Sequence, residues 1–192
     1  MTSGGEPRRR ADAERSRAAI IDAAARLFAQ RPGAGLAAVA AQAGVTRQTI
    51  YAHFASRDDL LAAVVDHVTD RTMAAMNALD PDEGSATDAL MRMLEVSWRA
   101  FEEYPVLSRG EPVPGDDRAR HVPVDDHLQR LIRRGQRTGE FDRTLKPDWL
   151  ATSIIALGHA AGEQVKDGRM TTRAAEKALR DSVLRLVGSS SS

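Results

Sequence analysis

Cysteine is absent from the 192 residues, which excludes disulfide bonds and thiolate metal sites. The chain also lacks an uninterrupted apolar run of the ~20 residues that a transmembrane helix requires, and its aromatic content is 4%. These absences suit a reducing compartment, so we expect a cytoplasmic protein with no membrane association. The hydrophobic content of 42% is nevertheless sufficient for one or two domains with buried cores.

Charge is distributed unevenly along the chain, although the net charge is zero. Residues 1–57 hold nine arginines against four acidic residues, a net charge of +5, and the remainder holds 18 basic against 23 acidic residues, a net charge of −5. A basic end on an otherwise acidic chain indicates contact with a polyanion. We expect residues 1–11 to form a disordered basic arm that is able to contact phosphate. It is not expected to be part of a signal peptide, because Asp22 and Arg26 interrupt the apolar run that follows.

Apolar residues recur with helical spacing, and no useful length of the chain alternates with period two, so we predict an all-α fold. The expected helices cover residues 12–30, 36–43, 46–54, 56–79, 86–104, 124–138, 148–166 and 171–187. Residues 104–124 hold four of the eight prolines and are expected to be largely loop. Residues 188–192, "GSSSS", are expected to form a disordered tail.

The stretch "AAQAGVTRQTIYAHFASRDDLL", residues 40–61, combines a short helix, a glycine turn and a second short helix, which together predict a helix-turn-helix. Ile50 and Phe54 lie four residues apart and share a face that packs inward. The opposite face is free to enter a major groove, where Arg bonds guanine and Gln bonds adenine. A solvated polar face on a helical hairpin is the alternative interpretation. The base-facing candidates are Arg47, Gln48 and Tyr51, and the phosphate-facing candidates are Thr46, Thr49, His53 and Arg57.

This stretch resembles the DNA-binding domain of TetR-family transcriptional regulators. The resemblance rests on the Ala-Gly-Val-Thr turn, on a Tyr two residues before a His, on the following Phe and on "RDD". "LIRRGQRTGEF" followed by "KPDWLATSIIALGHAAGEQV" is similar to the region of the sixth to eighth helices in that family. The resemblance implies a DNA-binding domain over residues 12–57, a ligand-binding and dimerisation domain over 58–187, and the residue roles given above.

The sequence departs from the family pattern before the second helix. The loop "RPGAG" is about two residues short, and Gly35, Leu36 and Ala37 stand where residues that contact DNA are common in the family. Ala52 likewise has little reach. We therefore expect few contacts from the second helix and more reliance on the arginine arm.

The resemblance implies a homodimer that binds double-stranded DNA and responds to a small-molecule effector. Two copies of the last two helices would form a four-helix interface. The expected interface residues are Leu150, Ile154, Leu157, Gly158, Ala161, Leu179, Val183 and Leu186. The weaker candidates for lining a ligand cavity are Met91, Leu94, Trp98, Phe101, His127 and Leu131. Ordinary core is the favoured interpretation for the apolar ones, and a surface position is the favoured one for His127.

Other functions are less well supported by the sequence. An enzyme is disfavoured, because no phosphate-binding glycine loop and no nucleophilic triad is recognisable. "HVPVDDH", residues 121–127, matches no common metal site, and no cofactor is expected. A constitutive DNA-binding protein without a cavity and a pure oligomerisation protein remain alternatives. Since all but three of the 27 basic residues are arginine, a GC-rich bacterial genome is indicated, and the family resemblance favours a repressor over an activator.

Overall fold

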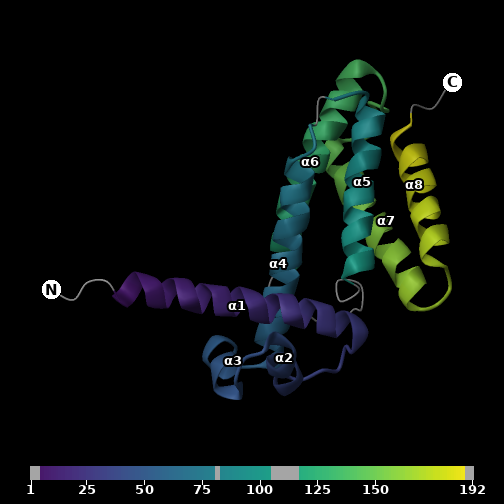
Figure 1. The fold of residues 1–192 in the computed structure, drawn as a ribbon. Helices are drawn as coiled ribbons and strands as arrows, with labels where there is room; N and C mark the ends of the chain where they lie inside the picture. The colour runs from purple at the N-terminus through teal and green to yellow at the C-terminus, as the bar shows by residue number, and fades with distance from the viewer. Residues whose placement is uncertain (1–4, 81–82, 105–116, 189–192) are drawn as a thin grey trace. The chain divides into compact units, whose positions relative to one another are not determined.

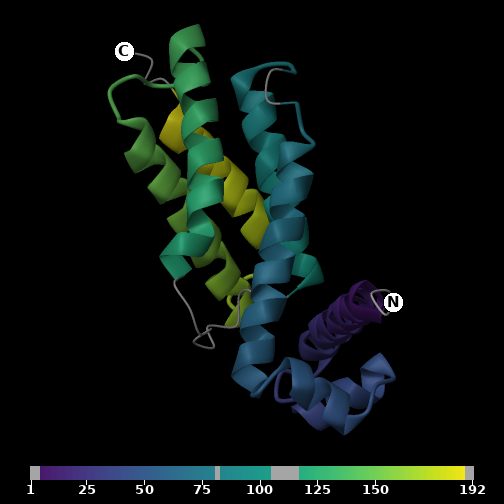
Figure 2. The same cartoon turned by 90° about the vertical axis from the view of Figure 1, so that its left-hand side faces the viewer.

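The computed structural model describes residues 5–80, 83–104 and 117–188, which form eight helices and no strand (Figures 1 and 2). The all-α prediction is confirmed. The helices are α1 (Gly5–Gln30), α2 (Leu36–Ala43), α3 (Arg47–His53), α4 (Arg57–Asn77), α5 (Ala86–Glu103), α6 (Asp117–Thr138), α7 (Pro147–Lys166) and α8 (Thr172–Val187). None of the helices in these ranges is long and apolar enough to cross a membrane.

The chain divides into two compact units, with the boundary between Val68 and Thr69 inside α4. The first unit holds α1, α2, α3 and the beginning of α4. The second holds the end of α4 together with α5 to α8. The sequence had suggested a boundary at residue 57, where α4 starts. Because α4 runs through the boundary without interruption, each unit uses a different stretch of this helix.

The first unit closes around apolar residues that the helical spacing of the sequence places on inward faces. Ile20, Phe28, Val39, Ile50 and Leu60 are buried completely or almost completely. α1 packs on α2, and α2 packs on α3. Burying a large aliphatic or aromatic side chain contributes ~1.5–3 kcal/mol, so these contacts are what hold two helices as short as α2 and α3 in place.

The turn between α2 and α3 depends on Gly44. Its φ of 68° and ψ of 26° are left-handed, a conformation in which a side chain would be strained. The N–H of Val45 donates to the carbonyl of Ala40 at 3.0 Å and the N–H of Gly44 donates to that of Ala41 at 3.3 Å. This pattern is a Schellman motif, which ends α2 at Ala43 and leaves three residues before α3 starts at Arg47.

The second unit has its own core, drawn from α4 to α8. Leu90, Ile132, Leu150 and Val183 have no exposed surface. α6 and α8 both pack on α7, and α5 lies beside α6 and α8. Phe141 presses on the backbone of Gly135, where an added Cβ would lie 2.2 Å from the ring. The ring of Phe141 therefore seals the core at the end of α6.

Two helices begin earlier than the sequence indicated. α1 starts at Gly5, so residues 5–11 of the expected disordered arm are helical, while residues 1–4 lie outside the described ranges. α6 starts at Asp117 and continues through Pro123, although a proline removes one backbone donor. Val124, Leu128 and Leu131 pack on the core directly after it. Near the C-terminus, Gly188 forms an isolated antiparallel bridge with Phe141. The first residue of the expected disordered tail is therefore part of the folded structure.

Candidate DNA-binding helix and effector cavity

α3 is anchored from behind and open in front. Ile50 is fully buried and Phe54 is 3% exposed, which fixes the rotation of this seven-residue helix. On the other side Arg47 and Gln48 are exposed, and the side chain of Tyr51 is 55% exposed. A Tyr that is more than half exposed, beside an exposed Arg and Gln, makes a surface able to read base edges.

The start of α3 is closed by Thr46. Its hydroxyl accepts the N–H of Thr49 at 3.1 Å, and the two hydroxyl oxygens lie 2.8 Å apart. Loss of such a cap costs ~1 kcal/mol. Thr46 is exposed, and Thr49 and His53 are half-buried. Thr46 therefore caps α3. Its predicted contact with phosphate stays a prediction.

Arg57 is placed differently from the prediction. Its guanidinium turns back toward the loop before α2, where Nε donates to the carbonyl of Ala34 at 3.3 Å and Nη2 donates to that of Pro32. The same group lies over the ring of Phe28, 5.2 Å from the centroid, and the side chain is 28% exposed. These contacts hold the α1–α2 loop and thereby support the domain, and the predicted contact of Arg57 with phosphate stays a prediction.

Arg17 was not among the sequence candidates. It lies on α1 as an exposed residue, with its guanidinium 5.4 Å from the centroid of the Phe54 ring. A cation–π contact at an exposed site is worth ~0.5–1 kcal/mol. Arg17 thereby puts a positive charge next to the end of α3, a long-range contact that spacing along the sequence gives no means of finding.

The second unit contains a cavity of about 350 Å³ between the end of α4, the beginning of α5 and α6. That volume falls within the ~300–1,000 Å³ of common small-molecule sites. Its lining comprises Met76, Leu79, Asp80, Ala89, Arg92, Met93, His127, Arg130, Leu131, Arg133, Arg134 and Arg137. Of the six residues expected to line a ligand cavity, His127 and Leu131 do so.

The other four expected ligand residues lie outside the cavity. Leu94 and Trp98 are buried in the core, while Met91 and Phe101 pack partly against it. The rings of Trp98 and Phe101 stack with centroids 4.8 Å apart. The Nε1 of Trp98 is buried and has no hydrogen-bond partner among the described residues. The apolar stripe of α5 completes the core, and the edge of that stripe, with Ala89 and Met93 next to Arg92, lines the cavity.

The hydrogen bonds described below for Arg92 and Arg130 at the cavity are to neutral groups. Arg92 donates to the carbonyls of Glu83 at 2.6 Å and Asp80 at 3.4 Å. Arg130 lies 2.8 Å from Nδ1 of His127. Burial, and to a smaller extent the charge of Arg130, lowers the pKa of His127 below its ordinary value, which favours a neutral ring.

The predicted dimer interface is largely occupied within the chain. Five of the eight residues are buried in the core of the second unit, namely Leu150, Ile154, Ala161, Leu179 and Val183. Leu157 and Leu186 are half-buried against that core, and Gly158 is half-buried. The most apolar faces of α7 and α8 therefore pack inside one chain.

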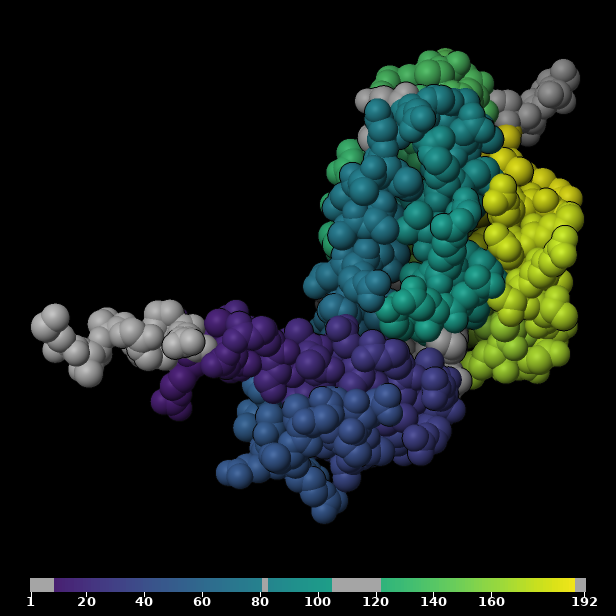
Figure 3. Space-filling model, viewed as in Figure 1, coloured from purple at the N-terminus to yellow at the C-terminus, as the bar shows by residue number. Residues whose placement is uncertain are grey.

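A different face of α7 is free of intrachain packing. Trp149, Thr152, Ala156 and Ala160 are all exposed and follow one stripe at intervals of three and four residues. The side chain of Trp149 is 60% exposed. On α8, Leu184 is 38% exposed, and in Figure 3 one side of α8 (yellow) is uncovered. Exposed aromatic residues among small ones are typical of surfaces that bind another protein.

No group of three or more His, Asp or Glu side chains able to hold a metal ion occurs among the residues that the structure describes. "HVPVDDH" lies partly outside that search, because the side chain of its first histidine is not described.

Comparison with known proteins places this arrangement in a family. The family model described as "Bacterial regulatory proteins, tetR family" matches residues 20–64, which begin in the second half of α1, include α2 and α3 and continue into α4. The chain is 44% identical over 162 residues to the HTH-type transcriptional repressor LfrR of Mycolicibacterium smegmatis. The aligned region is 81% of this chain and 82% of that protein.

Solved structures agree over nearly the whole chain. The TetR-like regulator LfrR from Mycobacterium smegmatis, in complex with proflavine, superposes with a TM-score of 0.65 at 29% identity, covering 91% of this chain and 97% of that one. A TetR-family regulator from Rhodococcus sp. superposes with a TM-score of 0.70 at 26% identity, covering 90% and 98%. The likeness thus extends beyond the DNA-binding domain to the helices of the second unit.

Proposed function

Because the chain belongs to the tetR family of bacterial regulatory proteins and is thus a DNA-binding transcriptional regulator, we propose that it is a homodimeric repressor that binds a palindromic operator. A small molecule in the cavity of the second unit releases it from that operator. Its working compartment is the cytoplasm, where the operator lies. The observation that carries the DNA-binding part is α3, on which Arg47, Gln48 and Tyr51 are exposed while Ile50 is locked into the core behind them.

Base readout divides among three side chains. Arg47 reaches the O6 and N7 of guanine with two donors, and Gln48 bonds the N6 and N7 of adenine. Tyr51 offers an apolar ring with a hydroxyl at its tip. Thr46, Thr49 and His53 sit at or beside α3 and contact phosphates, and Arg17 adds a charge next to them.

Dimerisation supplies the second half of the readout. Two recognition helices must lie ~34–36 Å apart to enter successive major grooves on one side of the duplex. The exposed stripe of α7 from Trp149 to Ala160 is the surface that we assign to the second copy, with α8 beside it. The buried residues expected from the sequence support this interface from within.

The cavity supports a ligand-responsive regulator over a constitutive DNA-binding protein. A constitutive protein has no need of a hollow of about 350 Å³ bordered by three helices. A ligand that binds more tightly to the form that cannot bind the operator shifts the population toward that form. The relative LfrR, whose structure holds proflavine, supports a small molecule as the effector.

Selection of bound DNA from a random pool tests the operator. We expect an inverted repeat whose half-sites are centred about one helical turn apart. An asymmetric or single half-site would contradict dimeric readout, and absence of any enriched sequence would contradict sequence-specific binding altogether.

Ala156→Arg tests the α7 interface. An arginine in the middle of the stripe would meet its own copy across a twofold axis, so we expect the dimer to dissociate. Sedimentation velocity measures this directly, with Ala74→Arg, the same change at an exposed alanine of α4, as the matched control. A dimer that survives Ala156→Arg would exclude this face.

A further inference from the structure

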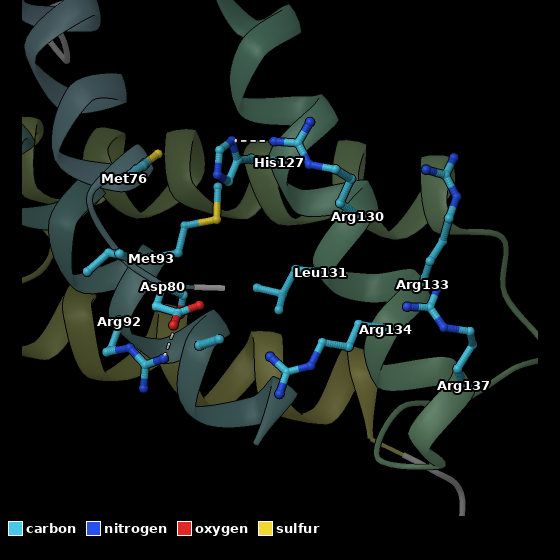
Figure 4. Close-up of a pocket in the computed structure, with 12 residues that line it drawn as sticks. Met76, Asp80, Arg92, Met93, His127, Arg130, Leu131, Arg133, Arg134 and Arg137 are labelled. Carbon is cyan, nitrogen blue, oxygen red and sulfur yellow. Dashed lines mark hydrogen bonds between the residues drawn. The ribbon is translucent and has the colours of Figure 1, made fainter. Parts of the chain in front are cut away.

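Four of the cavity's arginines lie on a single stripe of α6. Arg130, Arg133, Arg134 and Arg137 are separated by three or four residues, so they are neighbours along one face of the helix (Figure 4). Arg92 enters from α5 on the opposite wall, and the side chain of Arg134 extends toward it in Figure 4.

The charge of this lining is strongly one-sided. Five arginines stand against one acidic residue, Asp80, which leaves an excess of four positive charges around a cavity of about 350 Å³. Like charges at spacings of three and four residues destabilise a helix, and α6 carries four such pairs. Asp80 lies at the Arg92 end of the cavity, where its backbone carbonyl accepts a bond from that arginine.

The contacts described for Arg130 and Arg133 are to neutral groups. Arg130 contacts neutral His127, and Arg133 donates to the side-chain oxygen of Gln129 at 2.6 Å. Arg134 donates to the carbonyl of Gly84. Each guanidinium has five N–H donors, so a single neutral acceptor leaves Arg130 and Arg133 with capacity for an anion.

The floor of the cavity is apolar. Met76, Met93 and Leu131 are all buried, and Leu131 lies between the arginines above and below it in Figure 4. A solvated charged face on an ordinary helix has no such floor. Inorganic phosphate alone would leave these apolar surfaces in contact with water, so the lining fits a ligand with both an anionic head and an apolar body.

We propose that the cavity binds a small organic anion. Its carboxylate or phosphate head lies against Arg130, with Arg92 across from it, and its apolar body rests on Met93 and Leu131. This assignment rests on the proposed function, since it gives the chemical class of the effector. Charge-assisted bonds to guanidinium are about twice as strong as neutral ones, so the head determines which ligands enter.

Three probes of one shape test the role of charge. 2-Naphthoate, the neutral 2-naphthalenemethanol and the cationic 2-naphthylmethylamine are titrated into the full-length protein by calorimetry in the absence of DNA. We expect naphthoate to bind at least tenfold more tightly than the alcohol, and the amine to show no binding. Equal binding of all three, binding of the amine alone, or no binding of naphthoate would overturn the proposal.

Arg130→Gln tests the position of the head, because the one bond described for its side chain is to His127. We expect at least a tenfold loss of naphthoate affinity with little change for the alcohol, which shows that the cavity is still formed. Arg99→Gln is the control for the loss of one charge. Arg99 is an exposed arginine on α5, two turns beyond Arg92. An equal loss in both variants would mean that the protein's general charge, and not this cavity, attracts the anion.

The assignment fails separately from the proposed function. A protein that binds its selected operator and ignores naphthoate retains the proposed function and loses the anion site. If naphthoate binds with the expected dependence on Arg130 and the operator is not released, the anion site stands and its role as effector site is excluded.

Discussion

α3 and α6 both carry arginines to which we assign a ligand, and the difference between them lies in what accompanies the charge. On α3, Arg47 stands beside the neutral Gln48 and Tyr51 on an exposed face. On α6, four arginines line a cavity whose floor is Leu131 with methionines beside it. One guanidinium among neutral hydrogen-bonding groups suits a surface that must read base edges on a duplex that is charged everywhere. Several guanidinium groups around an apolar floor suit a small amphipathic anion.

The comparison teaches that a count of basic residues does not identify the partner. The basic excess of residues 1–57 pointed correctly to DNA-binding chemistry, whereas residues 58–192 are acidic overall and still contain the most basic cavity described. What decides is whether the fold gathers the charges at one place and what else it brings there.

The largest expected effect is on the preference for the operator sequence, which we assign to α3 and not to the cavity. Replacing both Gln48 and Tyr51 by Ala removes two of the three base contacts, and specific binding should fall toward the non-specific level, a loss of at least about 10³-fold. Fluorescence anisotropy with the selected operator and a scrambled duplex measures it. Arg99→Gln on α5 should leave the preference intact, and a double variant that still prefers the operator would remove Gln48 and Tyr51 from the readout.

A smaller effect distinguishes two arginines of the first unit. Arg47→Gln should weaken operator binding by about 1–3 kcal/mol through one lost base contact, with stability changed by less than about 0.5 kcal/mol. Arg57→Gln should lower stability and leave operator binding little changed. Because its bonds to the carbonyls of Pro32 and Ala34 are lost, the free energy of unfolding should fall by ~1–3 kcal/mol. Urea unfolding and anisotropy on the same samples check both. The opposite pattern would restore Arg57 to the phosphate contacts.

The smallest effect probes the electrostatics of the cavity through His127. Its folded-state pKa lies below the ordinary 6.5, so the unfolded chain takes up this proton first as the pH falls. The contribution of His127 to stability is therefore present above about pH 6.5 and is lost as the pH drops toward the folded-state pKa. NMR titration of the imidazole measures that pKa. Arg130→Gln should raise it part of the way, since burial remains, whereas Arg99→Gln should leave it unchanged. A pKa at or above the ordinary value would contradict the placement of His127 beside Arg130.

Local features of the sequence were sufficient for most of the first unit. Ser56 accepts the N–H of Asp59 at 3.0 Å and caps α4 as its position indicated, and Thr46 caps α3 in the same way. The inward positions of Ile50 and Phe54 followed from their spacing of four residues, and Gly44 adopts the left-handed conformation expected of it. These features depend on neighbours within one or two helical turns, which the sequence displays directly.

Features that depend on packing between distant segments were predicted poorly. Both Leu150 and Trp149 are apolar residues of one helix, and spacing alone does not say which of them faces the core and which faces outward. The fold buries Leu150 completely and leaves Trp149 exposed. In the same way Trp98 on α5 was a plausible cavity residue, but the rotation of α5 gave that place to Arg92.

The sequence by itself determined that the chain is helical, that residues 40–61 form a turn between two short helices, and which side chains of α3 point outward. Each of these follows from contacts within a few residues. Only the tertiary structure decided that Arg57 supports a loop, that the apolar faces of α7 and α8 pack within one chain, and that arginines of α5 and α6 line one cavity. Those outcomes depend on which of several possible faces each helix buries, a choice made by the packing of the whole core together.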